Sequence, residues 1–226
     1  MSCSFPGGRG DARLDPQPAE GALLRLGNVE RYDTRRRDYD EIVIAVDTAM
    51  ETGEANDYTA CVVLGRHGHH IDVLQVERDR LPFIEQLMLV RELTRSYPGA
   101  HVLVEAANSG VPLIEELRRN YALHVSAASA RRSKEERAIA VAPMLENGDV
   151  RLPADALWVN EFVRELRSFP HGTNDDMVDA LVHGLSFLKR HINRVRERPY
   201  PDARQRPSSS VRPRGNTRPP GAAIRR

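Results

Sequence analysis

The stretch that decides the fold is IVIAVD, residues 42–47. Five apolar residues, most of them β-branched, run without a polar break and end on Asp47. A run this short and continuous is typical of a strand buried on both faces. A carboxylate at the end of such a strand is either solvated in the following loop or held by a cation. The rest of the sequence must distinguish these two interpretations.

Length and composition indicate a soluble globular protein. The 226 residues suffice for one sizeable core or two small ones, with 40% hydrophobic and 29% charged residues. No apolar run approaches the roughly 20 residues of a membrane span, and the N-terminal residues show no apolar core of a secretory signal. Two cysteines, Cys3 and Cys61, are too few for a disulfide framework or a zinc site. We therefore expect a reduced, cytoplasmic setting.

Charge is distributed unevenly although the net charge is only +1. Residues 193–226 hold ten Arg against Glu197 and Asp202, a charge of about +8, whereas the remainder carries about −7. This tail also contains six Pro and a Ser run at 208–210, so we expect it to be disordered. Two interpretations stay open: an arm that attracts nucleic acid, or a solvated terminus without a specific role.

Three segments are expected. Residues 1–40, rich in Gly, Pro and Arg, are predicted to be a linker, residues 41–192 a single α/β domain, and residues 193–226 the basic tail. The strands are predicted at 42–47, 58–64, 71–76, 101–104 and 123–126, with a short extended piece at 150–152. The helices are predicted at 81–96, 109–121, 133–147, 155–168 and 175–190.

Local signals support these helices. Ile84, Leu87 and Met88 recur at the i, i+3, i+4 spacing of one helical face. Ser133 and Glu136 form the pattern of a capping box at the start of a helix. Three strands in succession, followed by alternating helices and strands, predict an antiparallel meander that continues into βα units. The expected fold is an RNase H-like mixed β-sheet of about five strands, the first three antiparallel, flanked by helices.

Acidic residues recur where the predicted elements begin or end. Asp47 ends the first strand and Glu105 ends the fourth, while Asp176 and Asp179 lie at i, i+3 on one face of the last helix. Asp175 is expected at the helix cap. Acids at a helix start need no metal, since they favour the helix dipole. Asp179, however, lies within the apolar run MVDALV, where a solvated carboxylate is not expected.

A cluster of these carboxylates would not remain empty and ionised. Two unit charges 4 Å apart repel by about 4 kcal/mol at an effective dielectric near 20. Either some of the carboxylates are protonated or divalent cations bind, and hard oxygen ligands select Mg²⁺ or Mn²⁺. Two such ions roughly 3.5–4 Å apart can activate a water and stabilise the leaving oxygen of a phosphodiester.

At these motifs the sequence resembles the C-terminal nuclease domain of the large terminase subunit of tailed bacteriophages, which has an RNase H-like fold. The resemblance runs from about residue 40 to about residue 188. It rests on the segments 42–49, 56–60, 104–106, 134–138 and 169–181, the last being the most specific. Upstream, residues 20–33 look like the connector that follows the terminase ATPase domain.

The resemblance implies a metal-dependent endonuclease that cuts concatemeric double-stranded viral DNA during genome packaging, with two Mg²⁺ or Mn²⁺ ions. Asp47 matches the first-strand aspartate of the family, Glu105 its second acidic ligand, and Asp176 and Asp179 its acids on the last helix, while Asp175 remains an additional candidate. The implied partners are the terminase ATPase domain, the small terminase subunit and the portal, with no membrane. The setting would be the host-cell cytoplasm.

Two departures from the family pattern stand out. Asn174 occupies the position where many relatives have His before the Asp pair. The chain also contains no G-x-x-x-x-G-K-[ST] phosphate loop, so by itself it is not an ATP-driven motor. We expect either an excised domain or the product of a short or split gene.

A basic cluster precedes and opens the helix predicted at 133–147, formed by Arg131, Arg132, Lys134 and Arg137. Contact with the DNA backbone and a solvated helix face remain equally open for it. Nothing in the sequence indicates base-specific readout. Two other functions also stay open: an RNase H-like Holliday-junction resolvase, and a non-catalytic module that binds DNA or the portal.

Overall fold

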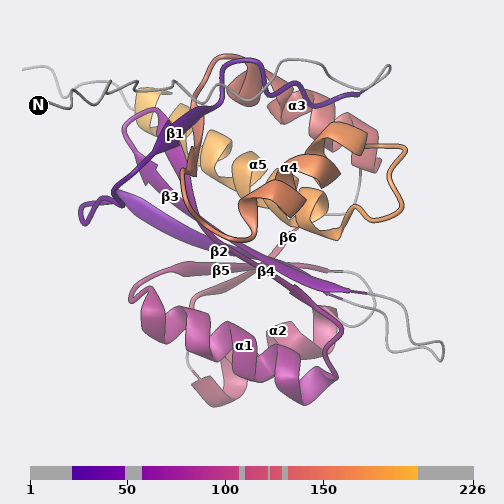
Figure 1. The fold of residues 1–226 in the computed structure, drawn as a ribbon. Coiled ribbons are helices and arrows are strands. Elements are labelled where there is room, and N and C mark those ends of the chain that lie inside the picture. The colour runs from indigo at the N-terminus through magenta and orange to yellow at the C-terminus, as the bar shows by residue number, and fades with distance from the viewer. Residues whose placement is uncertain (1–21, 49–57, 107–109, 122, 129–131, 198–226) are drawn as a thin grey trace, which may run out of the picture.

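A seven-stranded sheet with helices on both faces forms the core of the computed structural model (Figure 1). The structure describes residues 22–48, 58–106, 110–121, 123–128 and 132–197. The strands are β1 (Glu30–Tyr32), β2 (Glu41–Asp47), β3 (Thr59–His67), β4 (His70–Asp79), β5 (His101–Glu105), β6 (Val125–Ala128) and β7 (Val150–Pro153). The helices are α1 (Phe83–Ser96), α2 (Gly110–Tyr121), α3 (Lys134–Glu146), α4 (Val159–Ser168) and α5 (Asp176–Glu197).

The strand order is β1-β7-β4-β3-β2-β5-β6. The pairs β2–β3 and β3–β4 are antiparallel, which confirms the predicted meander. Strands β5 and β6 continue the sheet in parallel from β2, and β7 and β1 extend it in parallel from β4. The mixed α/β class is therefore confirmed.

The sheet has seven strands where about five were predicted. The additional pairing joins β7 to β4 and to β1, which lies in the segment expected to be a linker. Upstream of β1, Leu24, Leu26 and Val29 are at most 8% exposed and belong to the same core as the rest of the domain. Strands of three or four residues at an edge are too short to show an alternating pattern, so their pairing is decided by the neighbouring strand.

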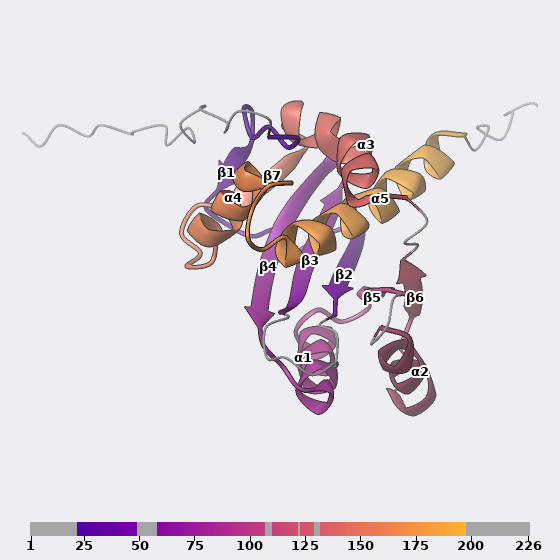
Figure 2. The ribbon, with the colours of Figure 1, turned by 90° about the vertical axis from the view of Figure 1, so that its right-hand side faces the viewer.

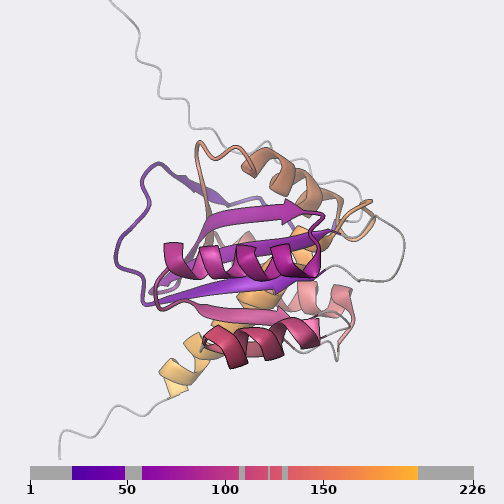
Figure 3. The same cartoon turned by 90° about the horizontal axis from the view of Figure 1, so that it is seen from below.

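Two helical layers cover the sheet. Helices α1 and α2 lie across one face, and α3, α4 and α5 cover the other (Figures 1 and 3). Each layer has its own apolar cluster: Val46 packs with the α1–α2 side, and Val43 and Ala60 pack with the α3–α5 side. Because successive side chains of a strand point to opposite faces, Asp47 emerges on the α3–α5 side.

Helix α5 crosses β2 and β3 at close range. A Cβ atom at Gly184 would lie 2.6 Å from Leu64 Cδ1 and 3.2 Å from Ala45 Cβ, so the helix approaches this closely because position 184 is Gly. The helix has 22 residues and extends beyond the predicted end near residue 190. Its first turns lie over the end of β2, which brings the acidic residues of α5 to the edge of the sheet.

The other helices follow the prediction with local differences. The capping box at Ser133 is present, with Glu136 N donating to Ser133 Oγ at 3.1 Å and Glu136 Oε2 accepting from Ser133 N. Helix α1 exposes Ile84 and Met88, 61% and 58% respectively, so the interpretation of these residues as its buried face is wrong. The helix instead buries Leu87, Val90 and Leu93, because these residues face the sheet.

The start of α4 also differs from the prediction. The helix begins at Val159, four residues after the expected position 155, because residues 154–158 are mostly turns and bends. Across the described residues, no helix is both long and apolar enough to cross a membrane.

Candidate active site

The four predicted carboxylates come together at one edge of the sheet. Strands β2 and β5 run parallel with Val46 beside Val104, so Asp47 and Glu105 end neighbouring strands. The first turn of α5 adds Asp176 and Asp179 above them. The charges of Glu105, Asp176 and Asp179 all act on Asp47, which shows that the four groups share one electrostatic environment.

Asp47 lies at the centre of this cluster and is half-buried. Burial raises the pKa of its carboxyl well above the usual range, and the charges of Asp179 and Glu105 raise it further. A hydrogen bond with Glu105 acts in the same direction. In this arrangement the proton on Asp47 relieves the repulsion among the acids.

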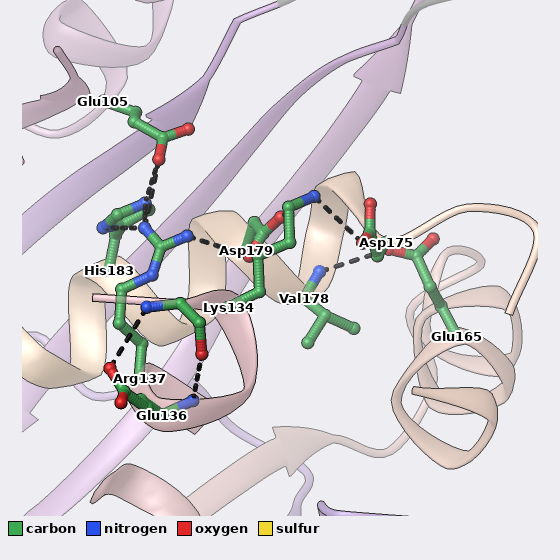
Figure 4. Close-up of polar contacts among 10 residues, drawn as sticks. Glu105, Lys134, Glu136, Arg137, Glu165, Asp175, Val178, Asp179 and His183 are labelled. Atoms are coloured by element: carbon green, nitrogen blue, oxygen red, sulfur yellow. Dashed lines mark hydrogen bonds and ion pairs between the residues drawn. The ribbon is translucent and has the colours of Figure 1, made fainter. Parts of the chain in front are cut away.

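Glu105 has the opposite character. Its Oε1 lies 3.2 Å from His183 Nε2 and 3.0 Å from Arg137 Nη1 (Figure 4). The hydrogen bond from His183 is the largest cause that lowers the pKa of Glu105 to about 2, and Arg137 adds to it. The sequence analysis found no Arg partner for Glu105; that interpretation is wrong, because Arg137 lies 32 residues away along the chain.

Asp179 is 2% exposed and contacts two cations. Lys134 Nζ lies 2.6 Å from Asp179 Oδ2, and Arg137 Nη2 lies 3.7 Å from Asp179 Oδ1 (Figure 4). Burial raises the pKa of Asp179, while the hydrogen bond and charge of Lys134 oppose that shift. Lys134 also reaches Asp175 Oδ2 at 3.0 Å, so Lys134 bridges two carboxylates at the start of α5.

Glu165 from α4 fixes the start of α5. Its Oε1 accepts from the backbone N–H of Met177 at 2.8 Å and of Val178 at 3.2 Å, two groups without partners inside the helix. Arg78 Nη1 lies 2.9 Å from Glu165 Oε2. A cap supplied by another helix holds the first turn of α5 in place, and with it Asp176 and Asp179.

Asp47 and Asp176 differ from the other acids in lacking a cation. No described Lys, Arg or His forms an ion pair with either carboxylate. The pKa of Asp176 is raised, by burial first and then by the charge of Asp175. The cluster therefore has more negative charge than Lys134 and Arg137 offset.

The donor set has the chemistry of a divalent-cation site. Within the described ranges, no group of three or more His, Cys, Asp or Glu side chains is arranged to hold a metal ion. Oxygens of Glu105 and Asp179 are engaged with Arg137 and Lys134 instead. The residues themselves are hard oxygen ligands, and two of them lack a counter-ion, so they fit Mg²⁺ or Mn²⁺.

Two residues at the site were missed by the sequence analysis. His183, 5% exposed, follows Asp179 by four positions and therefore lies on the same face of α5. A buried His within an apolar helical segment was the available signal. Glu165 gave no such signal, because its partner groups are backbone N–H groups of another helix.

The predicted basic cluster divides in the structure. Arg137 is buried and Lys134 is paired, both with carboxylates of the site. Arg132 is exposed, and Arg131 lies outside the described residues. Contact of this cluster with DNA stays a prediction.

The fold is similar to that of solved phage terminases. The large terminase nuclease from thermophilic phage G20c is 22% identical, with 73% of this chain and 94% of that chain covered and a TM-score of 0.55. A magnesium-bound structure of the same nuclease gives 20%, 75%, 98% and 0.56. The large terminase from a second thermophilic bacteriophage is 14% identical with a TM-score of 0.61, and this chain, three quarters of which is covered, spans 45% of its length.

These identities show likeness of fold. No curated protein sequence matches the chain significantly. The family model described as the terminase RNaseH-like domain matches residues 44–187, well over half of the sequence and the whole region that holds the carboxylate cluster. This chain therefore belongs to the terminase RNase H-like domain family.

Proposed function

We propose that the protein is a metal-dependent endonuclease that cuts double-stranded viral DNA. The observation that carries this proposal is the convergence of Asp47, Glu105, Asp176 and Asp179 at one sheet edge, with more negative charge than the nearby cations offset. Membership of the terminase RNase H-like family supports the same conclusion. The large terminase nuclease of phage G20c, whose fold is similar, has been solved with magnesium, zinc and cobalt.

Four carboxylates would hold two Mg²⁺ or Mn²⁺ ions: Asp47, Glu105, Asp176 and Asp179, with Asp175 as an additional candidate. Bound ions of this kind supply an activated water and stabilise the leaving oxygen of a phosphodiester. The choice of Mg²⁺ or Mn²⁺ rests on the oxygen-only donor set.

The surrounding residues prepare the acids for this role. His183 and Arg137 keep Glu105 ionised and fix the direction of its carboxylate. Lys134 holds Asp179 toward the start of α3 and offsets its charge. Glu165 fixes the turn of α5 from which Asp176 and Asp179 project. Each ligand is thus oriented by a second residue, as pre-organised sites require.

We further propose that residues 41–192 act as the nuclease unit of a packaging machine in the host-cell cytoplasm. Its partners would be the terminase ATPase domain, the small terminase subunit and the portal. The large terminase of the second thermophilic bacteriophage, which has been solved with ADP, supports the link to an ATPase domain because this chain covers less than half of it. The absence of a phosphate loop in this sequence is consistent with a motor supplied separately.

The direct test is nicking of supercoiled plasmid in Mn²⁺ or Mg²⁺ by the full chain. Wild-type protein should nick in either metal and not in EDTA, and Asp47→Ala should lose the activity. Asp155→Ala is the matched control, since Asp155 is exposed and has no ion pair with a described residue. Equal nicking by wild type and Asp47→Ala would sink the assignment.

Substrate comparison separates the alternatives. Faster cutting of four-way junctions than of linear duplex would favour a junction resolvase. Metal-independent DNA binding without any cutting would favour a non-catalytic DNA-binding or portal-docking module. The fold likeness to terminase nucleases favours the linear duplex.

A further inference from the structure

Two arginines meet one tyrosine beside the carboxylate cluster. Tyr58 immediately precedes β3, while Arg78 lies near the end of β4 and Arg80 just beyond it. The guanidinium carbon of Arg78 is 4.7 Å from the centroid of the Tyr58 ring, and that of Arg80 is 4.6 Å from it. The ring thus positions two cations at once through cation–π contacts.

The sheet register places this group on the same face as the acids. Ala60 of β3 pairs with Asp47 on one side and with Arg78 on the other. Paired residues share a face, and Tyr58 lies two positions before Ala60, so it shares that face too. The contact of Arg78 with Glu165 on α4 confirms the side. The arrowheads of β2 and β4 mark this common edge (Figure 2).

The separation along the edge is small. Two residues of extended chain put Tyr58 about 7 Å beyond the residue that pairs with Asp47, at about 3.3 Å per residue. Arg78 also acts on the charge of Asp176, which shows electrostatic continuity between the two groups. A duplex that reached the carboxylates would therefore pass beside Tyr58.

The two arginines have different tasks. Arg78 forms ion pairs with Glu161 and Glu165 and so belongs to the support of α5. Arg80 is exposed, and among the described residues no acid forms an ion pair with its guanidinium. Its stacking on Tyr58 orients the planar group and leaves its positive charge and N–H donors for a ligand.

The proposed chemistry needs such a free cation. DNA that approaches an acidic cluster is repelled, and Lys134 and Arg137 are already engaged with the carboxylates. A fixed positive charge at the rim offsets this repulsion and neutralises a backbone phosphate. Arg80 is held in the position to provide it.

We infer that Tyr58 and Arg80 form a contact site for a DNA backbone phosphate at the edge of the carboxylate cluster. This inference rests on the proposed nuclease function. The ring of Tyr58 orients the guanidinium of Arg80, which donates to the phosphate oxygens. Contact with the backbone alone carries no sequence information, so the site adds affinity to any duplex.

The test is fluorescence anisotropy of a labelled linear duplex with the full chain in EDTA, where no cutting occurs. Arg80→Glu should weaken binding about tenfold at moderate salt, and the slope of log K against log salt should become about one unit shallower. Tyr58→Ala should weaken binding by a smaller factor, about threefold, and Tyr58→Phe should restore binding relative to Tyr58→Ala, since a Phe ring keeps the stack.

Arg95→Glu is the matched control, because Arg95 is an exposed arginine near the far end of α1. The inference is overturned if Arg80→Glu binds as Arg95→Glu does, or if wild type does not bind duplex at all. Because the assay contains no metal, binding that depends on Arg80 in a protein that never nicks plasmid would overturn the proposed function and leave this contact standing.

Discussion

The two helical layers of this protein cover the same sheet and differ in what they bury. On the α1–α2 side, the contacts with the sheet are mainly apolar, and no ion pair among the described residues involves either helix. On the α3–α5 side, Asp179, His183, Arg137 and Glu165 are each less than a tenth exposed. Buried charge is costly unless it is paired. Its concentration on one side marks that side as the functional one.

Strand β2 takes part in both layers. Val46 points into the apolar cluster of α1 and α2, and the next residue, Asp47, belongs to the acidic cluster. One residue along the chain thus separates stability from chemistry. Substitutions on the two sides should therefore have opposite profiles, stability lost on one and cleavage lost on the other.

The largest effect is expected for Asp47→Asn. Cleavage should fall by about 10³-fold, since a central oxygen ligand loses its charge. Unfolding free energy at pH 7 should be equal to or higher than that of wild type, because the raised pKa of Asp47 means that its ionised form disfavours the folded state. Plasmid nicking and urea unfolding measure the two quantities. A large loss of stability would contradict the division between layers.

The reverse profile is expected for Leu117→Ala. Leu117 is fully buried in α2, so a cavity should cost about 2–5 kcal/mol of unfolding free energy. Cleavage per folded molecule should stay at the wild-type level. Leu157→Ala is the control, because Leu157 is 99% exposed and should cost almost nothing. Loss of cleavage in folded Leu117→Ala protein would show that the α1–α2 layer contributes to the site.

A pH-dependent effect is expected for Glu105→Gln. The pKa of Glu105 is lowered from 4.5 to about 2, by the hydrogen bond from His183 first, so ionised Glu105 stabilises the folded state above pH 4.5. This contribution is lost as the pH falls toward 2. The substitution should cost about 1–3 kcal/mol at pH 7 and progressively less as the pH falls from 4.5 toward 2, as urea unfolding at several pH values would show. A cost independent of pH would refute this account.

The smallest effect is expected for Ser133→Ala. Loss of the capping box should cost about 1 kcal/mol of unfolding free energy, because two backbone N–H groups lose partners. Ser96→Ala, at the exposed end of α1, is the matched control. Since α3 carries Lys134 and Arg137, a cleavage defect larger than the stability loss would indicate that the cap also positions the site.

Several features of the fold and site follow from local sequence. The apolar run of β2, the capping box of α3 and the acidic pair at the start of α5 each depend on neighbours along the chain, so periodicity and capping rules predict them. The four acids could be named because each ends a strand or opens a helix. The face of α1 could not, because Ile84 and Leu87 are both apolar and only the position of the sheet decides which is buried.

The sequence by itself determined the α/β class, the antiparallel meander and the acids at the element ends, because these depend on contacts within a few residues. Only the tertiary structure decided which cations meet those acids. Arg137 reaches Glu105 across 32 residues, and Lys134 reaches Asp175 across 41. It also gave Asp47 and Glu105 opposite pKa shifts, since burial and partners are properties of the assembled fold.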